Sequence, residues 1–334
     1  MSRLRRYLVP AVFNFVLVTV LLVAGLCHAL ELSQPIRCKY GTGCFVQNYV
    51  DVDPTPRASD FTCGSLTYDG HKGTDFRIPW ADYLKGTEVL AAAPGTVART
   101  RDGIEDRDAR GHEAEVRSQG LGNAVIIQHD EGYQTIYAHM KKGSVRVKEG
   151  DEVKRGQVLG LVGLSGLTVF PHLHFGVVRD GHVICPFLGR RADLPAQCGS
   201  STTPLWSQST RIGYIPTGLI RAGFYDERPK FPDLLRTPLK KRLSIKAPAI
   251  IYAVTVFGTQ EGDMVSMRIV DPLGRVIAQA DSPIEKTEAQ RLIFIGKKLK
   301  SPKEPWLDGV YQGEYELLRG GRTMVSASTR IELK

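Results

Sequence analysis

Apolar and polar residues alternate along most of the chain after residue 48. A period of two residues is typical of β-strands with one buried face, because successive side chains of a strand point to opposite sides. Residues 171–178 have this period, which directs His172 and His174 to one face. Hardly any segment of residues 49–195 has a helical period. The pattern therefore predicts a mainly β fold with an antiparallel β-rich core.

Residues 124–139 contain two apolar segments on either side of Asp130-Glu131-Gly132. Strand-like segments joined by a short Gly-containing turn predict a β-hairpin, here with His139 at its end. Residues 99–120 are dense in Arg, Asp and Glu and interrupt a neighbouring hairpin pattern. This insertion is either a solvated loop or a wall of a groove, since long loops beside sites often shape access to them.

Further along, the Ser, Thr and Gly content of residues 198–204 indicates a linker. Beyond it, alternating segments at 249–257, 264–270, 276–280, 291–295, 309–318 and 323–332 lie between Gly and Pro turns. This spacing predicts a small immunoglobulin-like β-sandwich. We therefore expect a domain at 49–195, a linker at 196–211 and an accessory domain at 212–334. The accessory domain is either a spacer or a contact surface for cell wall or a partner protein.

The N-terminus has the layout of a secretory signal peptide. Arg3, Arg5 and Arg6 precede an apolar run at 7–26, and Ala29 offers a small residue at a cleavage site. We expect residues 1–29 to be the signal and 30–48 an N-terminal extension. An uncleaved membrane anchor is the alternative, because the run is long enough to span a bilayer. Either outcome predicts export to the periplasm or cell envelope.

Five cysteines lie beyond the predicted signal. Cys38 and Cys44 flank a Gly-Thr-Gly turn, and Cys185 and Cys198 flank a short loop. Both pairs are expected to form local disulfides in an oxidising compartment. Cys63 is left over and is expected to be a buried thiol, since free cysteine is among the most buried residue types. The alternatives for Cys63 are a different pairing or a zinc ligand in a latent form.

The chain has 334 residues and a formal net charge of +9. Loss of the three arginines of the predicted signal leaves 9 − 3 = +6. A basic exported protein suits an anionic partner such as a cell-wall polymer or a membrane surface. No segment resembles a nucleic-acid-binding module and the predicted compartment is wrong for one, so we expect no nucleic-acid partner.

Three short segments carry residues that suit a catalytic zinc site. They are His-Lys-Gly-Thr-Asp, Tyr-Ala-His-Met and Pro-His-Leu-His-Phe, and they supply His71, Asp75, His139, His172 and His174. Catalytic zinc takes three nitrogen or oxygen ligands and leaves a position for water, whose pKa falls to about 7. Gly73 permits a backbone path that turns both flanking side chains to one point. Of the other histidines, His129 is expected in the core, and His112 and His182 at the surface.

These segments resemble the lysostaphin-type (LytM-type) zinc metallopeptidases, whose pattern is His-x-Gly-x-Asp, Tyr-x-His and His-x-His. The resemblance also takes in residues 122–127 and 147–160, and it covers about 49–187. It implies one zinc ion per chain, held by His71, Asp75 and His174. It also implies that His139 and His172 act as general base and transition-state stabiliser, without assigning which is which.

By the same resemblance, the chain is expected to be an exported endopeptidase that cuts peptide bonds in peptidoglycan cross-links or stem peptides with a metal-activated water. Two alternatives stay open. One is a non-catalytic regulator that activates a cell-wall amidase, although such relatives typically have eroded ligands and this chain keeps all of them. The other is an exported protease that acts on proteins.

Overall fold

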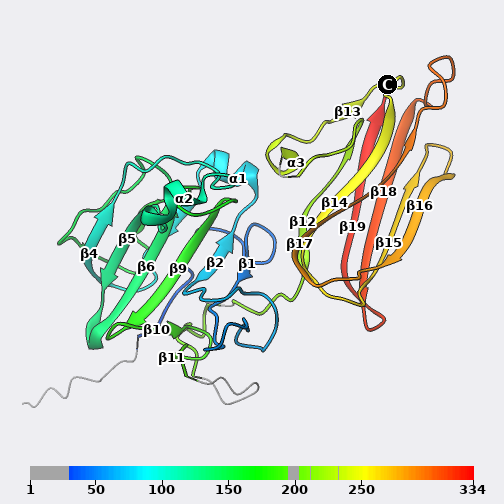
Figure 1. The fold of residues 1–334 in the computed structure, drawn as a ribbon. Helices are drawn as coiled ribbons and strands as arrows, with labels where there is room; N and C mark the ends of the chain where they lie inside the picture. Colours follow the sequence, from blue (N-terminus) through cyan, green and yellow to red (C-terminus); the bar gives the residue numbers. More distant parts are fainter. Residues whose placement is uncertain (1–29, 195–202, 211, 232) are drawn as a thin grey trace, which may run out of the picture.

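The structure is a computed structural model that describes residues 30–194, 203–210, 212–231 and 233–334, and Figure 1 shows two lobes. The predicted mainly β fold with antiparallel sheets is confirmed, although among the described strands β13 and β19 pair in a parallel manner. The predicted signal peptide lies outside the described residues. Within the described ranges, no helix has the length and apolar character needed to cross a bilayer.

The first lobe is built on a nine-stranded sheet in the order β1-β2-β9-β6-β5-β4-β7, with β10 and β11 attached through β9. Its strands are β1 (Phe45–Asn48), β2 (Thr74–Arg77), β4 (Gly95–Arg101), β5 (Asn123–Gln128), β6 (Tyr133–Met140), β7 (Glu152–Val153), β9 (His172–Arg179), β10 (His182–Cys185) and β11 (Arg190–Arg191). A separate two-stranded sheet pairs β3 (Glu88–Leu90) with β8 (Val158–Leu161). The short helices are α1 (Trp80–Lys85), α2 (Glu113–Val116), η1 (Arg117–Gln119) and η2 (Asp130–Gly132).

The predicted hairpin and the predicted histidine strand are both present. Strands β5 and β6 pair in an antiparallel manner across η2, where Glu131 and Gly132 have positive φ angles of 53° and 73°. Strand β9 begins at His172 and pairs with β2 on one side and β6 on the other. The pairing order places β9, β6 and β5 at the centre of the sheet.

The charged insertion lies between the paired strands β4 and β5 and is bonded to a neighbouring loop at 163–170. The Ala109 amide donates to the Thr168 carbonyl at 2.9 Å, and the Arg107 amide donates to the Leu164 carbonyl at 3.1 Å. The Asp106 carboxylate accepts from the Leu164 amide at 2.6 Å. The insertion therefore supports this loop through hydrogen bonds, which a fully solvated loop would not do.

The second lobe contains a three-stranded and a five-stranded sheet (Figure 1). The first comprises β12 (Gly218–Tyr225), β14 (Ala249–Thr259) and β17 (Glu288–Lys298); the second comprises β13 (Arg242–Leu243), β15 (Met264–Val270), β16 (Val276–Pro283), β18 (Gly309–Arg319) and β19 (Arg322–Leu333), and α3 (Asp233–Arg236) precedes β13. Apolar side chains of both sheets, such as Tyr252 and Met267, form one buried cluster, as in a β-sandwich. The predicted domain limits at 49–195 and 212–334 stay predictions.

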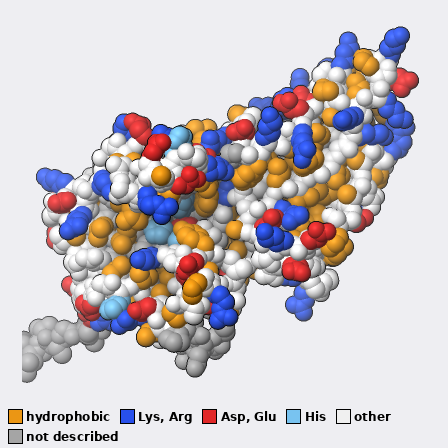
Figure 2. Space-filling model, viewed as in Figure 1, with side chains coloured by type: hydrophobic (Ala, Val, Ile, Leu, Met, Phe, Trp, Pro, Cys, Tyr) orange, Lys and Arg blue, Asp and Glu red, His pale blue; other side chains and the backbone are white. Residues whose placement is uncertain are grey.

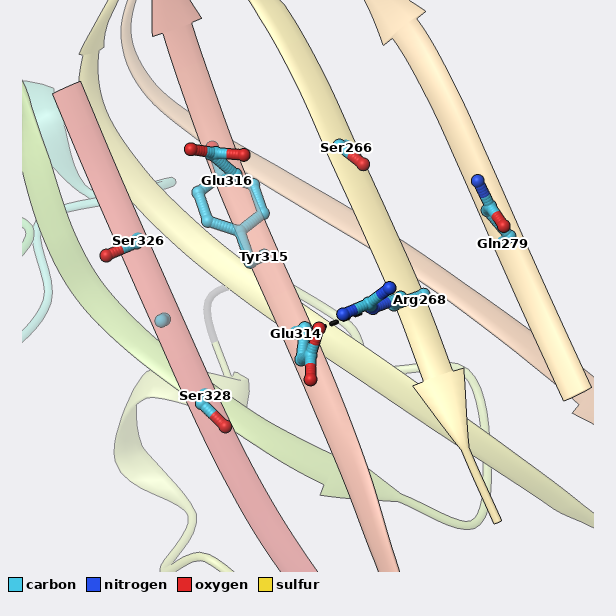
Figure 3. A pocket seen from close by; sticks show the side chains of 9 residues that line it. Ser266, Arg268, Gln279, Glu314, Tyr315, Glu316, Ser326 and Ser328 are labelled. Atoms are coloured by element: carbon cyan, nitrogen blue, oxygen red, sulfur yellow. Dashed lines mark hydrogen bonds and ion pairs between the residues drawn. The ribbon is translucent and has the colours of Figure 1, made fainter. Parts of the chain in front are cut away.

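One face of the five-stranded sheet is polar and hollowed by a cavity of about 470 Å³ (Figure 3). The polar side chains that line it come from four adjacent strands: Ser266, Arg268, Gln279, Glu314, Glu316, Ser326 and Ser328. Arg268 and Glu314 form an ion pair across β15 and β18. This ion pair partly neutralises the charged side chains that line the cavity.

The cysteines differ from the prediction at one pair. Cys38 and Cys44 form a disulfide, as expected. Cys185, however, is a free thiol buried in the first core, and burial raises its pKa to about 11. Its predicted partner Cys198 lies outside the described residues. Cys63 is disulfide-bonded, so the expected buried thiol and the latent zinc ligand at this position are both wrong. Short sequence separation favoured the Cys185 pairing, but the side chain of Cys185 packs into the core.

Candidate metal centre

Strand register brings the candidate residues to one face of the sheet. Asp75 on β2 lies directly opposite His174 on β9, and Arg77 lies opposite His172. Because opposed residues of an antiparallel pair share a face, as do residues two apart on one strand, all four side chains leave the sheet on the same side. His71 is contributed by the segment that leads into β2. Figure 2 shows histidine side chains gathered in the middle of the first lobe.

His139 reaches this face through an unusual backbone conformation. Its neighbour Ala138 lies opposite His174, so regular alternation would point His139 to the other side of the sheet. Instead, His139 has a φ of 59°, and its amide donates to the Leu121 carbonyl at 2.9 Å. A positive φ at a residue with a side chain is a strained conformation of the kind that clusters at functional sites. The local turn brings the His139 ring beside His172 and His174.

Three side chains converge as metal ligands would. His71 Nε2 lies 3.1 Å from Asp75 Oδ1 and 3.3 Å from His174 Nδ1, and His174 Nδ1 lies 2.9 Å from Asp75 Oδ1. His71 Nδ1 donates to the Tyr49 carbonyl at 2.7 Å, which leaves Nε2 without a proton when the ring is neutral. Two imidazole nitrogens and one carboxylate oxygen form a donor set that zinc accepts, so the residues present fit this ion.

Two further residues hold this group in place. Asn48 Nδ2 donates to Asp75 Oδ2 at 2.9 Å in a buried position and so turns the other carboxylate oxygen toward the histidines. A Cβ added at Gly73 would lie 2.5 Å from ring atoms of His174. The glycine of the His-x-Gly-x-Asp segment is therefore required because the ring packs directly against its backbone. Asn48 was missed by the sequence analysis because it stands alone in the predicted N-terminal extension.

The remaining two imidazoles are oriented by the loop that the insertion supports. His139 Nδ1 donates to the Ser165 carbonyl at 2.8 Å, and His172 Nδ1 donates to the Phe170 carbonyl at 2.9 Å. Thr168 Oγ1 lies 3.1 Å from His172 Nδ1. In each ring a backbone carbonyl accepts from Nδ1, so Nε2 is the nitrogen that can hold or accept a proton, and His172 Nε2 also lies 3.4 Å from Asp75 Oδ1.

Burial and charge set the protonation of the group. Burial, followed by the positive charges that His172 and His174 can carry, lowers the pKa of His139 well below its usual range. Burial opposes ionisation of Asp75, but the charges of His71 and His172 and the hydrogen bonds from His172 and His174 outweigh it, so the pKa of Asp75 is also well below its usual range. At neutral pH the site therefore holds an ionised carboxylate and a neutral His139.

A second group of three donors, His139, His172 and His174, also lies close enough to share an ion. Both groups contain His174, whose side chain is 12% exposed and the least buried of the five. The other histidines lie where the sequence predicts them. His129 is buried between the Pro94 carbonyl and Thr135 Oγ1, at 2.7 and 2.8 Å, and His112 and His182 are exposed.

The segment that contains the site matches the model of a known family. The model of peptidase family M23 matches residues 69–186, a span that contains all five candidate side chains. This part of the chain is an M23 (LytM-type) domain, in agreement with the resemblance inferred from the sequence motifs.

Curated relatives match the same region. The chain is 34% identical over 125 residues to the peptidoglycan DD-endopeptidase ShyA of Vibrio cholerae, a match that covers 37% of this chain and 23% of the relative. It is 35% identical over 120 residues to the DD-carboxypeptidase/endopeptidase Mpg of Neisseria meningitidis, covering 36% and 23%. The match thus spans less than a quarter of the length of either relative.

Solved structures with a similar arrangement include the catalytic domain of the prophage-encoded M23 protein EnpA from Enterococcus faecalis. That similarity has 25% identity and a TM-score of 0.31, and it covers 46% of this chain and 90% of EnpA. Another is a zinc-containing peptidase from Vibrio cholerae, with 28% identity, a TM-score of 0.28 and coverage of 45% and 40%.

Proposed function

We propose that this chain is an exported zinc-dependent endopeptidase that hydrolyses peptide bonds in peptidoglycan cross-links or stem peptides. The observation that carries the proposal is the pairing of a three-donor group, His71, Asp75 and His174, with two imidazoles whose Nδ1 atoms are held by backbone carbonyls. A structural zinc site closes all four positions with protein ligands, whereas a catalytic site uses three and keeps one open.

In this proposal His71 Nε2, Asp75 Oδ1 and His174 Nδ1 hold the zinc ion. A bound zinc ion would polarise the scissile carbonyl and lower the pKa of the water. His139 and His172 carry the proton: one Nε2 accepts it from the attacking water and returns it to the leaving amine nitrogen. The other imidazole donates to the oxyanion that develops on the carbonyl oxygen. The Ser165 and Phe170 carbonyls accept from Nδ1 of these rings, so Nε2 of a neutral ring is ready to accept a proton, and the imidazole that donates to the oxyanion is one that carries a proton on both nitrogens.

Peptidoglycan is proposed as the substrate because relatives of the M23 domain are named peptidoglycan DD-endopeptidases. The N-terminal pattern supports export to the periplasm or cell envelope, where that substrate lies. The regulator alternative is less well supported, because the five residues are all retained and all oriented by hydrogen bonds. A contact of residues 212–334 with wall or partner protein stays a proposal, and the polar hollow of Figure 3 is the surface to test for it.

The proposal is tested by digesting purified cell-wall sacculi with the full chain and weighing the released fragments by mass spectrometry. We expect peptide cross-links or stem peptides to be cut, the cutting to stop with a zinc chelator, and zinc to restore it. The variant His139→Ala should release fragments far more slowly than wild type, while His182→Ala, which changes an exposed histidine outside the site, should behave as wild type. Casein is digested in parallel. Cleavage of casein alone would favour the protease alternative, and no chelator-sensitive cleavage of either would favour the regulator.

A further inference from the structure

Arg77 is a buried charge without an acidic partner. Its side chain leaves the sheet on the same face as the metal-site residues, opposite His172, and the residue is only 4% exposed. The guanidinium donates to the side-chain carbonyl oxygens of Gln47 and Gln290, and no carboxylate among the described residues forms an ion pair with it. Burying an unpaired charge costs several kcal/mol, so a sequence that keeps one here has a reason to do so.

Two small cavities meet at Arg77, at the junction of the two lobes. One has a volume of about 170 Å³ and the other about 220 Å³, and Arg77, Phe170 and Arg110 line both. The first is also lined by Arg221 on β12 and by Arg236 in α3. No aspartate or glutamate lines either cavity. Residues from both lobes thus line these cavities, and the charged residues among them are all arginines.

The arginines around this space are only partly neutralised. Asp108 is paired with both Arg110 and Arg236, so four arginines face one carboxylate, a balance of 4 − 1 = +3. The Nε of Arg221 is buried and makes no hydrogen bond. An anion in the cavity would relieve both the unpaired charge and the unpaired donor.

The cavity begins one side chain away from the candidate catalytic group. The Phe170 ring lies under the Arg77 guanidinium, with 4.5 Å from the carbon of that group to the ring centroid. The Phe170 ring centroid also lies 4.6 Å from that of His172. A peptide whose scissile bond lies at His172 can therefore place a neighbouring group beside Arg77.

We propose that this arginine-lined cavity binds a free carboxylate of the substrate peptide, next to the bond that is cut. The inference rests on the proposed function, which places a peptide in the site. Peptidoglycan stem peptides carry free carboxylates, and arginine recognises a carboxylate through paired N–H donors. A cavity of this size holds a chain end or a side-chain carboxylate, not a whole peptide. The cavity is thus a specificity subsite and takes no part in the bond-breaking step.

The test measures binding by calorimetry in the zinc-loaded His139→Ala background, where hydrolysis is not expected. The probes are the stem tetrapeptide L-Ala-γ-D-Glu-meso-diaminopimelate-D-Ala with free carboxylates and the same peptide with every carboxylate amidated. Because hydrogen bonds to charged groups contribute strongly, we expect the free peptide to bind at least about tenfold more tightly. This preference should disappear with Arg77→Met and shrink with the less buried Arg110→Gln. Arg268→Gln, in the distant polar hollow, should keep it.

Thermal unfolding shows whether each variant folds, and Arg110→Gln carries the test if Arg77→Met does not. Equal binding of the two peptides by the parent protein would overturn the proposal, as would a full preference in the folded variants. Inorganic phosphate that binds more tightly than the free peptide would overturn the choice of a carboxylate. Binding does not depend on cleavage. A carboxylate preference together with intact sacculi would therefore refute the proposed function and leave the subsite standing.

Discussion

The hydrogen bond between Asn48 and Asp75 is predicted to set much of the zinc affinity. Asn48 Nδ2 and Asp75 Oδ2 are 2.9 Å apart and both residues are buried, so Asn48→Ala leaves a carboxylate oxygen without water or a donor. Loss of a hydrogen bond to a charged group costs about 1.5–3 kcal/mol. At about 1.4 kcal/mol for each factor of ten, zinc should bind roughly tenfold to a hundredfold more weakly. Outer partners of metal ligands in general contribute about as much.

The assay is a competition between the protein and a fluorescent zinc chelator of known affinity, performed on wild type and Asn48→Ala. Gln34→Ala is the matched control, because Gln34 also uses its side-chain amide for partly buried hydrogen bonds in the same lobe, but to the carbonyls of Ile36 and Cys38. Thermal unfolding of the metal-free proteins checks that both variants fold. An unchanged zinc affinity in Asn48→Ala, or an equal loss in Gln34→Ala, would refute the assignment of Asn48.

Three other outcomes are expected. Gly73→Ala puts a methyl group 2.5 Å from the His174 ring and should weaken zinc binding, measured as zinc per chain by mass spectrometry; full occupancy at low zinc would contradict the packing argument. His139→Ala should keep zinc and lose about 10²–10⁴-fold in turnover on sacculi, and wild-type turnover would exclude it as a proton carrier. Burial lowers the pKa of His129 in the folded protein. The neutral His129 ring therefore contributes its full stability above the unfolded-state pKa of about 6.5, and this contribution is lost as the pH falls through the lower folded-state pKa. Urea unfolding from pH 7.5 to 5 should show this loss, and the loss should be smaller in His129→Gln; equal pH dependence in the two proteins would refute it.

Local periodicity predicted the strands around the site but not every side-chain direction. The two-residue period of residues 171–178 placed His172 and His174 on one face, and β9 has that arrangement. The same rule applied to β6 would turn His139 away from them, because Ala138 occupies the position opposite His174. The positive φ at His139 places its ring on the same face as His172 and His174. A positive φ at a histidine cannot be predicted from the pattern of residues.

The roles of residues that act through tertiary contacts could not be predicted from the sequence. Asn48 and Arg77 each stand alone in their segments, and their importance follows from partners 27 and 213 positions away. Cysteine pairing failed for a similar reason: the short spacing of Cys185 and Cys198 favoured a local bridge, whereas Cys185 is enclosed by the first core and Cys63 is the bonded residue. Long-range packing, which leaves no local pattern, determines all of these.

The most direct test of the central claim is an anomalous difference map, recorded at the zinc edge from zinc-loaded crystals of the full chain. We expect a single strong peak within bonding distance of His71 Nε2, Asp75 Oδ1 and His174 Nδ1, with the Nε2 atoms of His139 and His172 uncoordinated. A peak bonded to His139 and His172, or no peak at this group, would contradict the division of the five residues into ligands and proton carriers.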